Sequence, residues 1–140
     1  MADIRKLTDE ISVAPQLTTE DIAEISGKFK SIICNRPDQE GGAEQPLYAD
    51  IEKLAKSEGI IVEYQPVNGS IIGDDDVDDF EDHLEALPKP VLAYCRSGTR
   101  CTVLWALSQA GKQSADDILK TTEAAGYPLD VLRPRIADRE

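Results

Sequence analysis

The segment around Cys95 constrains the fold of this chain more than any other part of the sequence. An apolar run, Val91–Tyr94, ends at Cys95, a short loop containing Gly98 follows, and apolar residues then recur at helical spacing over residues 103–107. This order predicts a buried strand, a tight loop and a helix. In such a unit the backbone N–H groups of the loop converge at the helix N-terminus, where anions bind. The sequence therefore predicts an anion site at the start of this helix.

Cys95 is the residue of this loop that can act as a nucleophile. The helix N-terminus and the flanking cations Arg96 and Arg100 should lower the pKa of its thiol and favour the reactive thiolate. A cation at a helix N-terminus is unfavourable by itself, so Arg100 implies a nearby anion. The alternative for Cys95 is a buried structural role, because free cysteine packs like a small apolar residue. We expect Cys95 and Arg100 to be catalytic, and the anion-binding groups to include Arg96, Ser97, Gly98, Thr99, Cys101 and Arg36.

Segments with helical and strand character alternate along the whole chain. We expect helices near residues 18–29, 46–58, 77–87, 101–110 and 114–125, a short one from residue 128, and strands over residues 32–34, 60–64 and 91–94. Such alternation predicts an α/β fold with a small, mainly parallel central sheet of about four or five strands flanked by helices. The carboxyl ends of parallel strands meet at one edge, where ligands bind. The Asn35-Arg36 turn and the loop over residues 65–73 should therefore lie beside Cys95.

Composition narrows the classes of function. The 140 residues are expected to form one domain, residues 1–140, and the net charge of −12 disfavours nucleic acid and anionic membranes as partners. No apolar segment approaches the roughly 20 residues of a membrane span. Three cysteines without CxxC spacing do not form a disulfide framework, so we expect a reducing, cytoplasmic location. An acidic chain that gathers arginines beside one cysteine suits a small anionic substrate.

The acidic run from Asp74 to Asp79 has two interpretations. Asp74, Asp76, Asp78 and Glu85 have the spacing of calcium ligands, but Asp79 stands where a calcium loop requires glycine. Acidic residues are also expected in the first turn of a helix, where they face its positive end. The cysteines and the single histidine are too widely spaced for a zinc site. We therefore expect no metal and no cofactor.

Two resemblances follow from these residues. The segment Cys95-Arg96-Ser97-Gly98-Thr99-Arg100 resembles the active loop of rhodanese-type sulfurtransferases, in which the cysteine carries a persulfide. The order of elements and the Asn35-Arg36-Pro37 turn instead resemble the compact dual-specificity phosphatase fold. The combination is similar to the family of beta-lactamase hydrolase-like proteins with a phosphatase-like domain, often labelled sulfur transferases. This resemblance spans residues 11–128.

The loop departs from the cysteine-phosphatase pattern, in which five residues separate the cysteine from an arginine. The sixth position after Cys95 is Cys101, Thr102 takes the hydroxyl position, and the arginine comes one residue early, at Arg100. The phosphatase fold also supplies an aspartate as general acid. Asn68 is the best-placed side chain here and cannot act as an acid, so Asp74 is the candidate general acid.

Three hypotheses follow for the function. The main one is a sulfurtransferase that passes sulfane sulfur through a Cys95 persulfide, because this chemistry needs no general acid. The first alternative is a phosphatase with a Cys95 phosphoenzyme, in which Arg100 binds the equatorial oxygens and Asp74 or a neighbour acts as acid. The second is a non-catalytic oxyanion-binding or redox-sensing module. Cys101 is either a packing residue or a resolving thiol, and Arg36 either assists the anion site or lies on the surface.

Overall fold

A five-stranded sheet forms the centre of the molecule. The computed structural model describes residues 2–140. The strands are β1 (Arg5–Lys6), β2 (Ile11–Ala14), β3 (Ser31–Cys34), β4 (Ile61–Tyr64) and β5 (Val91–Tyr94), in the spatial order β1-β2-β5-β3-β4. Only the edge strand β1 pairs antiparallel, with β2, and the other neighbours run parallel. The predicted α/β fold with a mainly parallel sheet is therefore confirmed.

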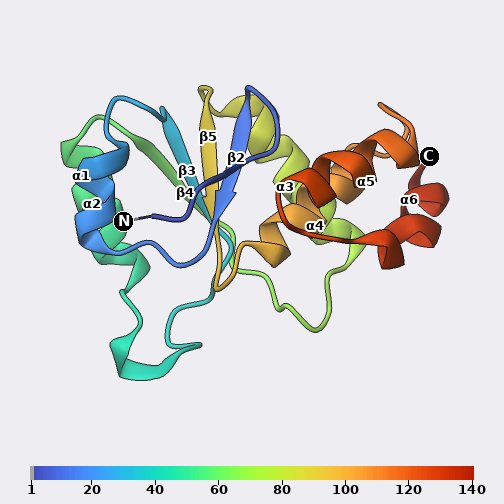
Figure 1. Cartoon of the computed structure of the whole chain (residues 1–140). Coiled ribbons are helices and arrows are strands. Elements are labelled where there is room, and N and C mark those ends of the chain that lie inside the picture. The colour runs from blue at the N-terminus through green and yellow to red at the C-terminus, as the bar shows by residue number, and fades with distance from the viewer. Residues whose placement is uncertain (1) are drawn as a thin grey trace.

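Six α-helices cover the two faces of the sheet in the described part of the chain. They are α1 (Thr19–Ile25), α2 (Tyr48–Ser57), α3 (Asp74–Ala86), α4 (Thr99–Ser108), α5 (Ala115–Ala124) and α6 (Arg133–Arg139). Short 3₁₀ turns cover Gly42–Glu44 and Asp130–Leu132. Helices α1 and α2 lie on one side of the sheet and α3 to α6 on the other (Figure 1). No helix within residues 2–140 combines the length and apolar character needed to cross a membrane.

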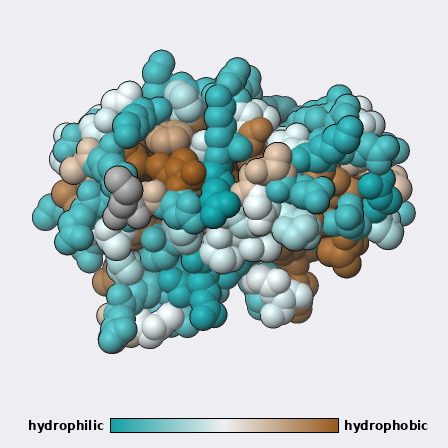
Figure 2. Space-filling model, viewed as in Figure 1, coloured by the Kyte–Doolittle hydropathy of each residue, from teal (hydrophilic) through white to brown (hydrophobic). Residues whose placement is uncertain are grey.

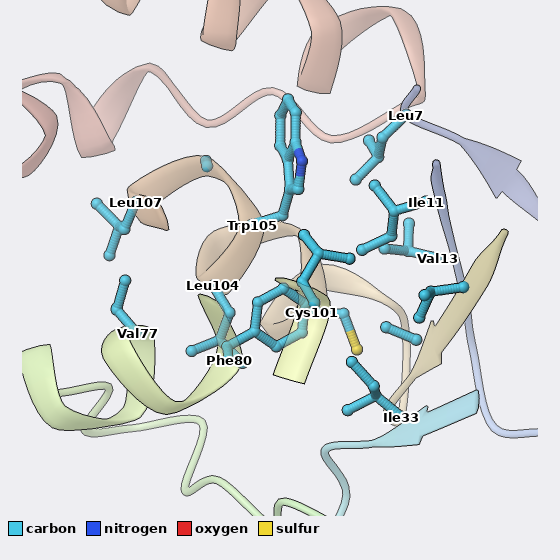
Figure 3. Packing of buried hydrophobic residues seen from close by; sticks show 14 of the residues in the cluster. Leu7, Ile11, Val13, Ile33, Val77, Phe80, Cys101, Leu104, Trp105 and Leu107 are labelled. Atoms are coloured by element: carbon cyan, nitrogen blue, oxygen red, sulfur yellow. The ribbon is translucent and has the colours of Figure 1, made fainter. Parts of the chain in front are cut away.

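The buried residues form two clusters, one on each face of the sheet. Alternate residues of β5 serve different faces: Val91 and Ala93 pack toward α3 and α4, and Leu92 and Tyr94 toward α1 and α2. In the first cluster the ring of Phe80 on α3 lies beside Leu104 on α4 (Figure 3). Figure 2 shows that hydrophilic side chains cover most of the visible face, as expected for this charged chain. Burial on both faces explains why β5 reads as a continuous apolar run.

Most of the expected elements are present, and one central strand was missed. Thr18 caps α1 in a capping box with Asp21, at the start of the helix expected near residues 18–29. Strand β2 has only four residues, and its parallel pairing with β5 buries all of them. Ser12 interrupts the apolar run of β2, whereas all four residues of β5 are apolar, so the sequence indicates β2 less clearly than β5.

Burial in the sheet predicts that two isoleucines contribute differently to the free energy of unfolding. Ile33 of β3 is 0% exposed and Ile71, in the loop after β4, is 73% exposed. Ile33→Ala should lower the free energy of unfolding by about 2–5 kcal/mol, because it removes buried methyl groups and leaves a cavity. The matched change Ile71→Ala should stay within about 0.5 kcal/mol of the wild type. Urea unfolding followed by circular dichroism measures both values, and equal losses would contradict the described core.

Candidate active site

The register of the sheet brings three loops to one edge. Strands β3, β4 and β5 end side by side, because Cys34 pairs with both Tyr64 and Tyr94. The residues that follow, Asn35, Gln65 and Cys95, therefore begin three neighbouring loops. The structure thus places the Asn35-Arg36 turn and the loop after β4 beside the Cys95 loop, as the sequence predicts.

The loop between Cys95 and α4 folds around the sulfur of Cys95. Gly98 is the N-cap of α4 and has a φ of +89°, a left-handed conformation that favours glycine. This conformation aims the Gly98 N–H at Cys95 Sγ over 3.1 Å. The loop therefore forms the predicted nest of N–H donors, with the sulfur atom as its present acceptor.

This environment changes the acidity of the Cys95 thiol. A hydrogen bond from the Cys101 side chain, helped by the backbone N–H groups of Cys101, Ser97 and Gly98, lowers the pKa of Cys95 to about 6 against the opposing effect of burial. At neutral pH Cys95 is therefore largely thiolate. Only 1% of the residue is exposed, so these donors act where little water screens them.

The other two cysteines remain thiols at neutral pH. Burial raises the pKa of Cys101 well above its ordinary value, and the neighbouring Cys95 raises it further. Burial also raises the pKa of Cys34 to about 11, and its Sγ donates to the carbonyl of Arg36 over 3.3 Å. All three cysteines are buried, and Cys95 alone among them is a thiolate at neutral pH. The resolving-thiol role of Cys101 stays a prediction.

Arg100 is held at the junction of the three loops. Its Nη1 and Nη2 groups donate to the two carboxylate oxygens of Glu40 over 3.1 and 3.0 Å, and Nη1 donates to the carbonyl oxygens of Val67 at 2.9 Å and Asn35 at 3.4 Å. The anion implied by a cation in the first turn of α4 is thus, at least in part, the chain's own carboxylate. The bidentate pair fixes the plane of the guanidinium group.

Arg36 joins the same network. Its Nε donates to Glu40 Oε1 over 3.1 Å and its Nη1 donates to Gln16 Oε1 over 3.1 Å. The Arg36 side chain is 9% exposed and that of Arg100 is 11% exposed. The hydrogen bonds from Arg100 and Arg36 keep the pKa of Glu40 below its usual range, so Glu40 stays ionised and balances one of the two buried cations. Arg36 is therefore not a surface residue, although its part in anion binding stays a prediction.

The outer part of the Cys95 loop faces solvent. Arg96, Ser97 and Thr99 are exposed, and Ser97 Oγ donates to Thr99 Oγ1 over 3.0 Å. A pocket of about 160 Å³ lies beside the loop, lined by Gly69, Ile72, Ser97, Thr99, Arg100 and Val103. Its volume is close to the roughly 150 Å³ of a cavity that holds one benzene molecule. The loop thus borders a pocket with both apolar and polar walls.

Asp74, the candidate general acid, lies elsewhere. Its carboxylate accepts a hydrogen bond from Arg139 Nη1 over 3.0 Å, and Arg139 Nε donates to the carbonyl of Leu107 in the last turn of α4. Cys95 precedes the first turn of the same helix. The position of Asp74 therefore gives no support to a general-acid role, and Arg139 also pairs with Asp78 of the acidic run.

Three residues of the site were missed from the sequence. Glu40 holds both arginines, Gln16 supports Arg36, and the Tyr127 hydroxyl donates to the carbonyl of Ser97 over 3.0 Å. A β-carbon at Gly98 would clash with that hydroxyl, so Tyr127 packs directly against the loop. None of the three stands next to Cys95 in the sequence, and no local pattern marks them.

Fold and loop together place the chain among α/β proteins of the cysteine-phosphatase type. The chain belongs to the family described as beta-lactamase hydrolase-like protein, phosphatase-like domain, whose model matches residues 3–112. It is 30% identical over 127 residues to the beta-lactamase hydrolase-like protein of Agrobacterium fabrum, covering 89% of this chain and 29% of that protein. The chain thus spans under a third of the length of this relative. The resemblance drawn from the sequence is confirmed.

Solved structures agree with this assignment. A candidate phosphatase of Neisseria meningitidis Z2491 has 37% identity and a TM-score of 0.87, with 98% of each chain covered. The core catalytic domain of the PP-IP phosphatase SIW14 from S. cerevisiae, solved with citrate, has 18% identity and a TM-score of 0.71, covering 96% of this chain and 83% of that one. The latter shows a shared fold alone.

The lowered pKa of Cys95 predicts a characteristic pH dependence of alkylation. Because only the thiolate reacts, the rate of Cys95 carbamidomethylation by iodoacetamide should rise between pH 5 and 7, with a midpoint of about 6, and level off above. Cys34 should react slowly throughout this range. Peptide-resolved mass spectrometry follows each cysteine separately. A Cys95 midpoint above about 8, near that of an unperturbed thiol, would contradict the described environment.

Proposed function

We propose that this domain is a cysteine-dependent phosphatase that hydrolyses small phosphate monoesters through a Cys95 phosphoenzyme. The observation that carries the proposal is the Cys95 thiolate enclosed by N–H donors at the N-terminus of α4. Such a nest binds tetrahedral oxyanions, and a thiolate inside it can attack one. Membership in a phosphatase-like family favours this hypothesis over the sulfurtransferase that the loop alone suggests.

The first chemical step is attack of the Cys95 sulfur on phosphorus. An S–P bond forms while the P–O bond to the alcohol breaks, and its electron pair goes to the alcohol oxygen, which takes a proton from water. The loop N–H groups then donate to the phosphoryl oxygens, where negative charge gathers in the transition state. In the described structure Cys95 is 1% exposed and the Gly98 N–H donates to its sulfur, so the substrate must displace part of the loop to reach that atom.

Arg100 is suited to bind the same phosphoryl group. Glu40 and two carbonyl oxygens occupy Nη1 and part of Nη2, whereas no hydrogen bond from Nε occurs within the described residues. A β-carbon at Gly69 would lie 3.1 Å from Nε, so the absence of a side chain leaves room beside that edge. A guanidinium edge with two parallel N–H groups matches two oxygens of a phosphate.

The second step returns the enzyme to its starting state. Water attacks phosphorus, the S–P bond breaks, and its electron pair returns to the sulfur. Inorganic phosphate leaves and one proton passes to solvent. A sulfur with a low pKa is a good leaving group, so the environment that activates Cys95 also favours this release.

The surroundings of Cys95 restrict the leaving group. Asp74 is paired with Arg139, and Glu40 is held ionised by two arginines, so neither carboxylate is placed to donate a proton. Esters of acidic alcohols such as phenols leave without that proton. The pocket beside the loop has room for one ring, which favours aryl phosphates as test substrates.

The same lack of a proton donor supports sulfur transfer as a second candidate. The Cys95 thiolate would attack the outer sulfur of thiosulfate, forming a new S–S bond while the old S–S bond breaks and sulfite departs with the electron pair. Cyanide would then take the outer sulfur as thiocyanate and restore the thiolate. No step requires an acid, because sulfite is a stable anion.

Parallel assays decide between the two reactions. Wild-type protein is expected to release phosphate from p-nitrophenyl phosphate, and Cys95→Ser should lose at least about a thousandfold in rate because a serine hydroxyl is not ionised at neutral pH. Cys34→Ser, which changes another buried cysteine, should retain activity. Thiocyanate formation from thiosulfate and cyanide without phosphate release would replace the phosphatase by the sulfurtransferase. Activity with neither substrate would favour a binding module.

Glu40 offers a second test. Glu40→Gln removes the charge that aligns Arg100, so kcat/KM should fall about 10- to 100-fold, the equivalent of losing charged hydrogen bonds of about 1.5–3 kcal/mol. Glu44→Gln, an exposed change in the same loop, should leave kcat/KM unchanged. Steady-state kinetics with an aryl phosphate measures both variants. A rise in kcat/KM for Glu40→Gln would show instead that Glu40 competes with the substrate for Arg100.

A further inference from the structure

A single peptide unit links Tyr127 to the nucleophilic sulfur. The hydroxyl of Tyr127 donates to the carbonyl oxygen of Ser97 over 3.0 Å. The N–H of Gly98 donates to Cys95 Sγ over 3.1 Å. This carbonyl and this N–H belong to the same trans peptide bond, which is planar, so the two groups point in opposite directions and turn together. A contact that fixes the oxygen therefore also fixes the direction of the hydrogen bond to the sulfur.

Gly98 by itself leaves this peptide unit free to turn. Glycine adopts positive and negative φ about equally well, so the residue type does not impose the φ of +89° that aims the N–H at the sulfur. Rotation of the unit to the opposite orientation would bring the Ser97 carbonyl oxygen toward the sulfur, and an oxygen without a proton cannot donate to a thiolate. Another interaction must therefore select the observed orientation.

The carbonyl groups on either side of this unit are held by backbone donors. The N–H of Gln16 donates to the carbonyl of Arg96 over 3.3 Å. A backbone N–H of α4 donates to the carbonyl of Gly98 over 3.1 Å. The Ser97 carbonyl instead accepts from a side chain 30 positions away in the sequence. A substitution at Tyr127 can thus remove this one contact and leave the neighbouring backbone bonds in place.

Elements outside the loop set the position of Tyr127. Its N–H donates to the carbonyl of Thr122 in α5 over 2.8 Å. Arg5 Nη1, on the edge strand β1, donates to the carbonyl of Ala125 in the same turn over 3.1 Å. Tyr127 is half-buried and packs against the first core cluster. The hydroxyl is therefore presented to the loop by a turn that is itself anchored at both sides.

We propose that Tyr127 is a positioning residue whose hydroxyl fixes the Ser97–Gly98 peptide unit, so that the Gly98 N–H faces the Cys95 sulfur. The proposal rests on Cys95 being the nucleophile of the proposed function, and it holds whether phosphate or sulfur is transferred. A hydrogen bond to the charged form of an acid favours ionisation, so this orientation stabilises the thiolate.

The Tyr127 hydroxyl remains a neutral donor while Cys95 titrates. Burial raises the pKa of Tyr127 above its ordinary value, the nearby Arg5 opposes this effect, and Cys95 raises the pKa further. Asp3, the other charged side chain near the ring, is paired with Arg5 over 3.0 Å. A change of reactivity in the acid and neutral range therefore reports Cys95 and not Tyr127.

The test is the pH profile of Cys95 alkylation by iodoacetamide in the intact chain. Its midpoint reports ionisation, and its plateau rate at high pH reports access to the buried sulfur. Tyr127→Phe removes the hydroxyl and keeps the ring, so the midpoint should rise by about half to one pH unit. The rate at pH 6, relative to the plateau, should fall about two- to fivefold. Tyr48→Phe, which removes a hydroxyl that donates to Glu52 on α2, should leave the midpoint unchanged.

A second variant separates the hydroxyl from the ring. Tyr127→Leu also removes the hydroxyl, so the proposed role requires it to raise the midpoint as Tyr127→Phe does. If the ring only fills space beside the loop, Tyr127→Leu alone should differ from the wild type. An unchanged midpoint in Tyr127→Phe would overturn the proposal even if the protein hydrolyses phosphate esters. A raised midpoint would support it even without phosphatase activity, because alkylation needs no substrate.

Discussion

The hydrogen bonds that converge on one sulfur atom are the interactions on which this site depends. Cys95 Sγ accepts a hydrogen bond from Gly98 N–H at the start of α4, and hydrogen bonding within the loop lowers its pKa to about 6 although burial opposes ionisation. The loop must therefore hold its donors in place before any substrate arrives. The left-handed conformation of Gly98, backed by Tyr127, provides that rigidity. Preorganised donors of this kind stabilise developing charge without a cost of rearrangement during the reaction.

The site also depends on the sheet, which brings three loops together at one edge. Because β3, β4 and β5 are parallel and end in register, Asn35, Gln65 and Cys95 emerge side by side. The guanidinium of Arg100 then reaches the carbonyl groups of Asn35 and Val67 on two neighbouring loops. Core packing on both faces fixes this register, since a slip by one residue would turn the side chains of a strand to the wrong face. The stability of the sheet and the geometry of the site are thus linked.

The charges within the site are also balanced by a contact between separate segments of the chain. Two largely buried arginines beside a thiolate would be costly without a partner, and Glu40 provides one carboxylate for both. The two arginines and Glu40 together carry one positive charge, which the Cys95 thiolate balances, so the site is close to neutral in a chain whose total charge is −12. An anion therefore meets less repulsion at this loop than over most of the surface. Neither carboxylate considered as a proton donor is free, because Glu40 and Asp74 are both paired with arginines.

Sequence patterns alone predict the strand, loop and helix around Cys95, the alternation that defines the α/β fold, and the edge of the sheet at which the loops meet. These features follow from local periodicity, glycine geometry and the direction of parallel strands. The three-dimensional packing was needed to show that β2 is a strand, that Glu40 joins Arg36 to Arg100, and that Asp74 pairs with Arg139. These contacts join residues from separate elements, and no local pattern specifies which of many polar side chains will meet.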